Sequence, residues 1–125
     1  MKNLKEFKAL ILKYESITLE DIRTAFIECP YVDQIAHLLT GFGSMDTCTL
    51  CKAVFTAGAK FPNCASCVYR GDTDTIAYCN SHGNVETYCA IKGAETSQEL
   101  KLAFKNRAKH MRKILTEKGI TYEKP

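Results

Sequence analysis

Cysteine spacing is the feature of this sequence that most directly suggests chemistry. The chain of 125 residues has seven cysteines, and four of them form two Cys-x-x-Cys pairs separated by twelve residues. Two intervening residues let both sulfurs of a pair converge on one ion, and four thiolates complete the closed tetrahedral shell that suits zinc. The sequence therefore predicts a structural zinc site formed by Cys48, Cys51, Cys64 and Cys67.

Three more candidate ligands follow these pairs and leave the ligand set open. Cys79 and His82 have Cys-x-x-His spacing, and Cys89 comes later. One zinc needs only four ligands, so Cys79 and Cys89 could replace one of the two pairs. The alternative is that both are small buried apolar residues, which is how we interpret Cys29, alone before Pro30.

Two other cysteine chemistries are alternatives to zinc. An iron–sulfur cluster also takes four cysteines, although the compact cysteine run of bacterial ferredoxins is absent. A thiol-redox site needs one exposed Cys-x-x-Cys at a helix start, a place that Cys48 and Cys51 could occupy. The intervening Thr49 and Leu50 are not typical of oxidoreductases, and the second pair nearby favours a metal.

Catalytic motifs are mostly missing from the sequence. It contains no Gly-rich phosphate loop of the GxxxxGK[ST] type, no GxSxG and no HExxH. The zinc deaminase pattern is also absent, because no histidine has glutamate two residues later. A zinc enzyme is the third possible class of function. Its general acid or base could be Asp72, Asp74, His82 or Glu86, although no spacing favours any of them. The question of catalysis stays open, and a non-catalytic role is favoured.

Positive charge is concentrated in the last part of the chain. Residues 96–125 hold eight Lys or Arg and three Asp or Glu, a net of +5, whereas the whole chain has a formal charge of +3. Five of these basic residues fall within about 120° of one another on a helix. Such a face can bind nucleic-acid phosphates or a protein partner, and the alternative is an ordinary solvated helix surface. The five residues are Lys101, Lys105, Lys109, Arg112 and Lys113.

The elements before the cysteines are predicted to be helices. Apolar residues recur at helical spacing over 3–14, and Thr18 with Asp21 resembles the capping box that starts a helix. Pro30 interrupts this second helix, and a third is predicted from about residue 30 to Thr40. Gly41 is a natural stop. The residues expected to be buried in the second and third helices are Leu19, Ile22, Phe26, Ile35, Leu38 and Leu39.

The cysteine region is predicted to contain little regular structure. Asp46 or Thr47 could cap a short helix that carries Cys48 and Cys51. Residues 70–93 are rich in Gly, Asp, Thr, Asn and Ser, and they predict a loop with at most a short hairpin. A loop of this length is unusual in a compact domain, so a bound metal would explain how it is ordered.

The last helix has the strongest pattern. Residues 96–99 fit a capping box, and Gly119 is the expected end. An apolar stripe at helical spacing predicts the buried face. Its members are Leu100, Phe104, Ala108, Met111 and Leu115.

Together these patterns predict a mainly α single domain over residues 1–125. Helices over 1–45 and an amphipathic basic helix over 96–119 enclose a Cys-rich metal-binding insert over 46–93. No stretch approaches the roughly 18 apolar residues of a membrane helix, so we expect no membrane association. Lysines spread through residues 1–14 do not resemble an export signal, which predicts a cytoplasmic protein and reduced thiols.

The cysteine pattern also resembles that of a group of small bacteriophage proteins of uncharacterised function. In that group Cys-x-Leu-Cys is followed by Cys-x-x-Cys and Tyr-Cys ahead of a polar helix. The matching stretches are Cys48-Thr49-Leu50-Cys51, Cys64-Ala65-Ser66-Cys67, and either Tyr78-Cys79 or Tyr88-Cys89, within residues 46–115. The chain departs from the group at Ser66 and Val68, where glycine and proline are usual. The resemblance implies no activity; it implies an accessory protein in the host cytoplasm, directed at host machinery.

The function expected from the sequence is that of a small zinc-binding accessory protein. It would act as a binding module for a protein partner or a nucleic acid, through the basic helix.

Overall fold

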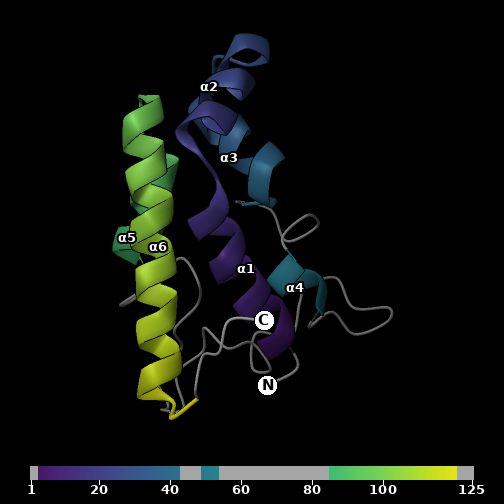
Figure 1. Cartoon of the computed structure of the whole chain (residues 1–125), viewed down its shortest axis with the longest axis vertical. Coiled ribbons are helices and arrows are strands. Elements are labelled where there is room, and N and C mark those ends of the chain that lie inside the picture. The colour runs from purple at the N-terminus through teal and green to yellow at the C-terminus, as the bar shows by residue number, and fades with distance from the viewer. Residues whose placement is uncertain (1–2, 43–48, 54–84, 121–125) are drawn as a thin grey trace.

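The structure is a computed structural model of the whole chain, and it describes residues 3–42, 49–53 and 85–120. Every regular element in these ranges is a helix, which confirms the mainly α prediction. Figure 1 shows the arrangement of the helices. They are α1 (Leu4–Ser16), α2 (Leu19–Glu28), α3 (Val32–Thr40), α4 (Thr49–Ala53), α5 (Val85–Lys92) and α6 (Ser97–Glu117).

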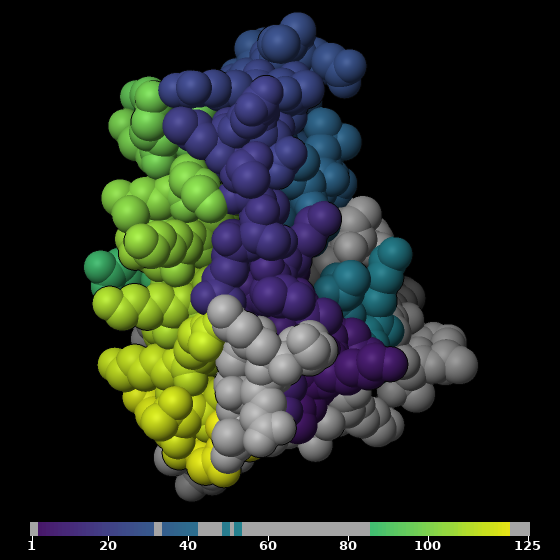
Figure 2. All heavy atoms as spheres, viewed as in Figure 1, coloured from purple at the N-terminus to yellow at the C-terminus, as the bar shows by residue number. Residues whose placement is uncertain are grey.

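The pair of α1 and α6 forms the centre of the molecule. The two helices lie side by side, with α2 and α3 at one end (Figures 1 and 2). Both helices are amphipathic, and the whole predicted stripe of α6 is buried. Burial of apolar surface is the main stabilising contribution to such a pairing. The fully buried side chains at this contact include Phe7, Ile11, Leu100, Phe104, Met111 and Leu115.

Local signals in the sequence set the ends of α2 and α3. The Thr18 hydroxyl accepts a hydrogen bond from the Asp21 amide, and the Asp21 carboxylate accepts one from the Thr18 amide. This reciprocal pair is the predicted capping box. At the end of α3, Gly41 has φ of 76°, a left-handed conformation that glycine adopts without steric cost.

The ends of α6 also match their sequence signals. The Thr96 hydroxyl accepts from the Glu99 amide, as in a capping box. The Glu99 carboxylate, however, accepts from the Glu95 amide, one residue before the N-cap. Gly119, with φ of 71°, follows the C-cap residue Lys118 and ends the helix as predicted.

Two structural predictions were wrong. Residues 85–92 were predicted to be loop, but they form α5, where Ile91 is fully buried and the Tyr88 ring packs on Phe42 with centroids 4.8 Å apart. Helix formation there depends on contacts with distant residues, which overrides weak local periodicity. Leu38 was predicted to be buried but is 69% exposed, because α3 turns Ile35 and Ala36 to the core instead.

The other predicted core residues divide between full and partial burial. Ile22 and Ile35 are fully buried, whereas Leu19, Phe26 and Leu39 are half-buried. The short helix predicted to carry Cys48 and Cys51 is present as α4, which includes Cys51, whereas Cys48 lies outside the described residues.

Candidate functional site

The predicted metal ligands fall mostly outside the described part of the chain. Cys51 lies in α4 and Cys89 lies in α5. Across residues 3–42, 49–53 and 85–120, no three His, Cys, Asp or Glu residues are grouped so as to hold a metal ion. The predicted ligands outside these ranges are Cys48, Cys64, Cys67, Cys79 and His82.

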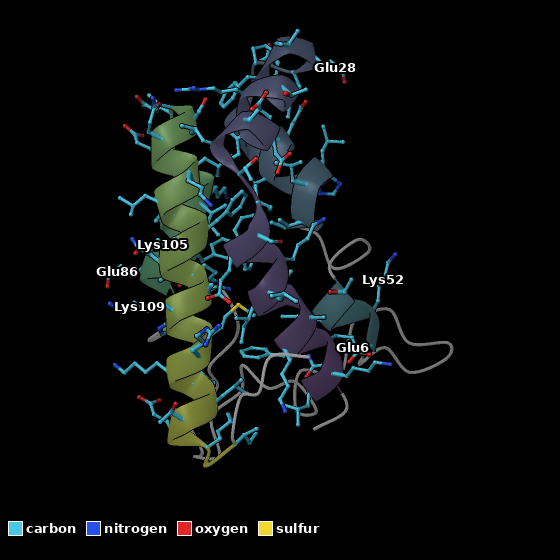
Figure 3. The ribbon with its side chains drawn as sticks, viewed as in Figure 1. Glu6, Glu28, Lys52, Glu86, Lys105 and Lys109 are labelled. Atoms are coloured by element: carbon cyan, nitrogen blue, oxygen red, sulfur yellow. The ribbon has the colours of Figure 1, made fainter. Side chains whose placement is uncertain are left out.

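The helix that carries Cys51 is attached to the N-terminal end of α1. Leu50 is buried in the main core cluster. The Asn3 side chain is also fully buried, and its Nδ2 donates to the Leu50 carbonyl at 3.3 Å. Lys52 projects from the opposite side of α4, away from α1 (Figure 3). A hydrogen bond and an apolar contact therefore fix the position of α4, which carries Cys51, on the helical core.

Cys89 lies on a different side of the molecule. The helix α5 packs on α6 and α3, whereas α4 packs on α1. Figure 1 shows α4 and α5 on opposite sides of α1. Cys89 is exposed and has a free thiol. Cys51 and Cys89 therefore lie on helices on different sides of α1, and the ligand set stays a prediction.

Cys29, expected to be a buried apolar residue, is only half-buried. It ends α2 as the C-cap residue, and its thiol lies 3.2 Å from Oε1 of Gln34. A thiol S–H can donate weakly to an amide oxygen. Cys29 thus contributes to the connection between α2 and α3.

Two of the five predicted basic residues hold α6 against α1. Lys101 Nζ donates to the carbonyl of Ile17, just beyond the end of α1. Arg112 Nη2 lies 2.7 Å from Oε1 of Glu15. Both contacts join residues that are far apart in sequence. These two cations therefore have structural roles, and they are the poorest candidates for contact with a ligand.

The other three basic residues form an exposed row, which we call the lysine ridge: Lys105, Lys109 and Lys113. They are spaced four residues apart, so successive Cα atoms rise by about 6 Å along the helix. Lys113 has a long ion pair of 3.9 Å with Glu117, and within the described ranges Lys105 and Lys109 have none. Figure 3 shows Lys105 and Lys109 on the outer side of α6, opposite Lys52. The ridge is thus a solvent-facing row of positive charge.

The contact between α5 and α6 contains a buried cation that the sequence analysis missed. Arg107 is only 3% exposed, and its Nη1 donates to the Thr87 hydroxyl at 2.8 Å. Its position three residues after Phe104 places it beside the apolar stripe, which is the signal that could have predicted its burial. Arg107 therefore joins α6 to α5 and does not add to the lysine ridge.

The electrostatic surroundings of α6 change the titration of one further residue. Partial burial lowers the pKa of His110 below its ordinary value, and the nearby charges of Arg107 and Lys113 lower it further. Glu117 and Glu86 oppose this effect more weakly. Glu86 lies on the same edge of the molecule as the two labelled ridge lysines (Figure 3). This part of α6 therefore favours the neutral imidazole.

Comparisons with known proteins add no relatives. No family model matches the chain, and no curated protein or solved structure matches it either. Among residues 3–42, 49–53 and 85–120, no helix is long and apolar enough to cross a membrane.

Proposed function

We propose that this protein is a small zinc-stabilised binding module whose lysine ridge contacts the phosphate backbone of a nucleic acid. Cys48, Cys51, Cys64 and Cys67 hold the zinc in this proposal. The metal has a structural role, because a closed four-thiolate shell leaves no position for substrate. The resemblance to small bacteriophage proteins would place such a module in the host cytoplasm, acting on host machinery.

The observation that carries the nucleic-acid proposal is the division of basic residues on α6. Lys101 and Arg112 contact α1, and Arg107 is buried against α5. Lys105 and Lys109 face solvent on the outer side of the same helix. A row of lysines on an exposed helix can contact successive phosphates of a nucleic-acid backbone. Such phosphate contacts supply most of the affinity in sequence-independent binding.

Salt dependence of binding to a labelled duplex tests this proposal. With three lysine–phosphate contacts, the logarithm of the association constant should fall against the logarithm of salt concentration with a slope of about −2.7. The Lys105→Gln/Lys109→Gln variant removes two contacts, so its slope should be about −0.9. Fluorescence anisotropy over a salt series measures both slopes. Lys101 is left intact in this variant because it contacts Ile17.

A matched control removes the same charge from another part of the surface. Lys5 and Lys52 are both exposed, and Lys52 lies opposite the ridge in Figure 3. The Lys5→Gln/Lys52→Gln variant should keep the wild-type slope. Equal slopes in the two variants, or no duplex binding at low salt, would reject the ridge as a nucleic-acid site. Binding to a protein partner through the same helix would then be the better hypothesis.

The zinc proposal rests on the spacing of the two cysteine pairs and on the anchoring of α4. The distance between the two Cys-x-x-Cys pairs is typical of structural zinc sites. The Asn3–Leu50 hydrogen bond fixes the helix that carries Cys51 on α1, so a metal at that pair would connect the cysteine region to the core. Metal binding would then contribute directly to folding free energy.

Elemental analysis of protein purified without chelator or nickel resin tests the metal. One zinc per chain is expected, with no visible absorption. Iron together with sulfide would identify an iron–sulfur cluster. An absence of metal, with the cysteines paired in disulfides, would reject both the zinc site and the cluster. The variant Cys64→Ser should lower the melting temperature if zinc is structural. Normal melting together with a lost activity would indicate a catalytic metal instead.

A further inference from the structure

Exposed apolar side chains gather at the end of the molecule formed by α2 and α3. Ile27 is 86% exposed and Tyr31 is 63% exposed, and Leu38 also lies largely outside the core. Tyr31 is the N-cap residue of α3 and Leu38 lies near the end of that helix, so both belong to the hairpin of α2 and α3. Ile27 precedes Tyr31 by four residues, at the end of α2. Isolated exposed apolar residues are ordinary, but several of them on one short hairpin indicate an interaction surface.

The charge around these residues is negative. Residues 18–38 contain four acidic residues and a single basic one, Arg23. Glu28 is exposed next to Ile27, and Figure 3 shows it at the tip of the hairpin. If the same surface of a second copy bound here, acidic residues would face acidic residues and repel one another. Charge therefore favours a partner surface that combines an apolar side chain with lysine or arginine.

The chain itself presents such a surface. Leu102 on α6 is 57% exposed and precedes Lys105 by three residues and Lys109 by seven, so all three share one side of the helix. The first turns of α6 lie near α2, since Lys101 contacts Ile17 immediately before α2 begins. Figure 1 shows the N-terminal end of α6 at the same end of the molecule as α2 and α3.

We propose that the hairpin surface of one copy, with Ile27, Tyr31, Leu38 and Glu28, binds the Leu102–Lys105 surface of a second copy. In this proposal a two-fold axis relates the two copies, so that each presents its hairpin surface to the Leu102–Lys105 surface of the other. This arrangement closes at a dimer and does not continue as a filament. The exposed apolar residues are few, so the dimer is weak and forms in the micromolar range or above.

Sedimentation velocity over a concentration series tests the dimer. The wild-type sedimentation coefficient should rise with concentration up to about 0.5 mM. Leu38→Asp should raise the dimer Kd by about tenfold or more, because it adds a charge at the centre of the contact. Leu38 is outside the core, so this variant should keep its helical circular dichroism and its melting temperature. A monomer at every concentration would overturn the proposal.

A charge exchange tests the pairing of the two surfaces. Glu28→Lys and Lys105→Glu should each weaken the dimer several-fold, and the double variant should recover most of the loss. Lys52→Glu, with the same change of charge on α4, should have no effect. A dimer that is insensitive to all of these changes would overturn the proposal.

Nucleic-acid binding separates this inference from the proposed function. Leu38→Asp and Glu28→Lys leave α6 unchanged. They should therefore weaken the dimer. At protein concentrations below the dimer Kd, where Lys105 is released from the dimer contact, the salt slope of duplex binding should keep its wild-type value. Loss of the dimer with intact duplex binding supports both the dimer and the nucleic-acid function. An unaltered dimer in Leu38→Asp rejects the dimer contact alone.

Discussion

The rings of Tyr14 in α1 and Phe104 in α6 stack with their centroids 5.3 Å apart and their planes inclined by 22°. Phe104 is fully buried and Tyr14 is nearly so. Stacked aromatic pairs contribute about 0.5 to 1.5 kcal/mol beyond the burial of their area. This contact joins the last turn of α1 to the N-terminal half of α6 within the buried core, so the stability of the fold should depend on it.

Shortening Phe104 should therefore destabilise the protein strongly. Phe104→Ala should cost about 3 to 5 kcal/mol through lost burial and the cavity left behind. Small domains have about 5 to 15 kcal/mol of stability, so the loss in Phe104→Ala is a large part of the total. The milder variant Phe104→Leu should cost about 1 to 2 kcal/mol. Urea unfolding followed by circular dichroism measures both. Leu102→Ala on the exposed side of α6 is the control and should change stability by less than about 0.5 kcal/mol.

The ion pair between Glu15 and Arg112 should contribute much less than that aromatic contact. Its N–O distance is short, at 2.7 Å, but both side chains are about one third exposed. Solvent-screened pairs of this kind have coupling energies of about 0.2 to 1 kcal/mol. A double-mutant cycle with Glu15→Gln and Arg112→Gln measures the coupling, which should decrease further in high salt. A coupling above about 2 kcal/mol would contradict this assignment.

Acid should weaken the N-terminal end of α2 through Asp21. Its hydrogen bonds with Thr18, first from the backbone amide, lower the pKa of Asp21 below its ordinary value of 3.8. The folded state therefore binds a proton less readily than the unfolded state. The stabilisation is complete above pH 3.8 and is lost as pH falls through the lower folded-state pKa.

Asp21→Asn should consequently reduce the slope of stability against pH in that acidic range. The measurement is urea unfolding at several pH values below neutrality, compared with wild type. Glu20→Gln is a suitable control, because Glu20 is the exposed neighbour of Asp21 in the first turn of α2. Equal acid slopes for the wild type and Asp21→Asn would show that the capping carboxylate does not control this transition.

His110 should add a second pH dependence at higher pH. Burial is the first cause of its lowered pKa, followed by repulsion from Arg107 and Lys113. The unfolded state therefore takes up a proton first, so stability decreases as pH falls below the ordinary value of 6.5 towards the folded-state pKa. Histidine NMR titration should show the lowered pKa, and His110→Gln should remove the corresponding part of the stability slope. A folded-state pKa above 6.5 would contradict this account.

Local sequence signals predicted the helices whose determinants lie within the helix itself. The Thr18–Asp21 capping box and the five-residue stripe of α6 specify their elements with little reference to the rest of the chain. The helix α5 could not be predicted in this way. Its packing depends on Phe42 against Tyr88 and on the contacts of α5 with α6 and α3, and the contacts with Phe42 and α3 join segments far apart in sequence.

The basic face was predicted as a group, but its members have different roles. On a helical projection Lys101 and Arg112 lie beside the apolar stripe, whereas Lys109 and Lys113 lie farther from it. Cations next to a buried stripe can reach the neighbouring helix, which is what Lys101 and Arg112 do. The spacing along α6 was enough to separate these two groups. The partners of Lys101 and Arg112, which are Ile17 and Glu15, could be identified only from the packing of α1 against α6. The ligand set of the predicted zinc site stays a prediction.

Asn3 should control the attachment of α4, and with it the position of the segment that carries Cys51. Asn3 is the N-cap of α1 but makes no capping hydrogen bond with its side chain, and its Nδ2 instead donates to the Leu50 carbonyl. Asn3→Ala leaves that buried carbonyl without this donor, at a cost of about 1 to 3 kcal/mol. Hydrogen exchange should show the loss as faster exchange in α4, while the α6 amides change less.

Zinc retention provides a second measurement for the same variant. In the proposed zinc site, a less firmly held α4 would position Cys51 less well and so weaken the metal affinity. Asn3→Ala should therefore lose zinc to a competing chelator more readily than wild type, and Asn3→Asp, which keeps the shape but not the donor, should behave in the same way. Ser16→Ala is the control, because the Ser16 hydroxyl donates to the Lys13 carbonyl at the far end of α1 from α4. If α4 exchanges faster in Asn3→Ala but zinc affinity is unchanged, then Asn3 anchors the helix without positioning a metal ligand.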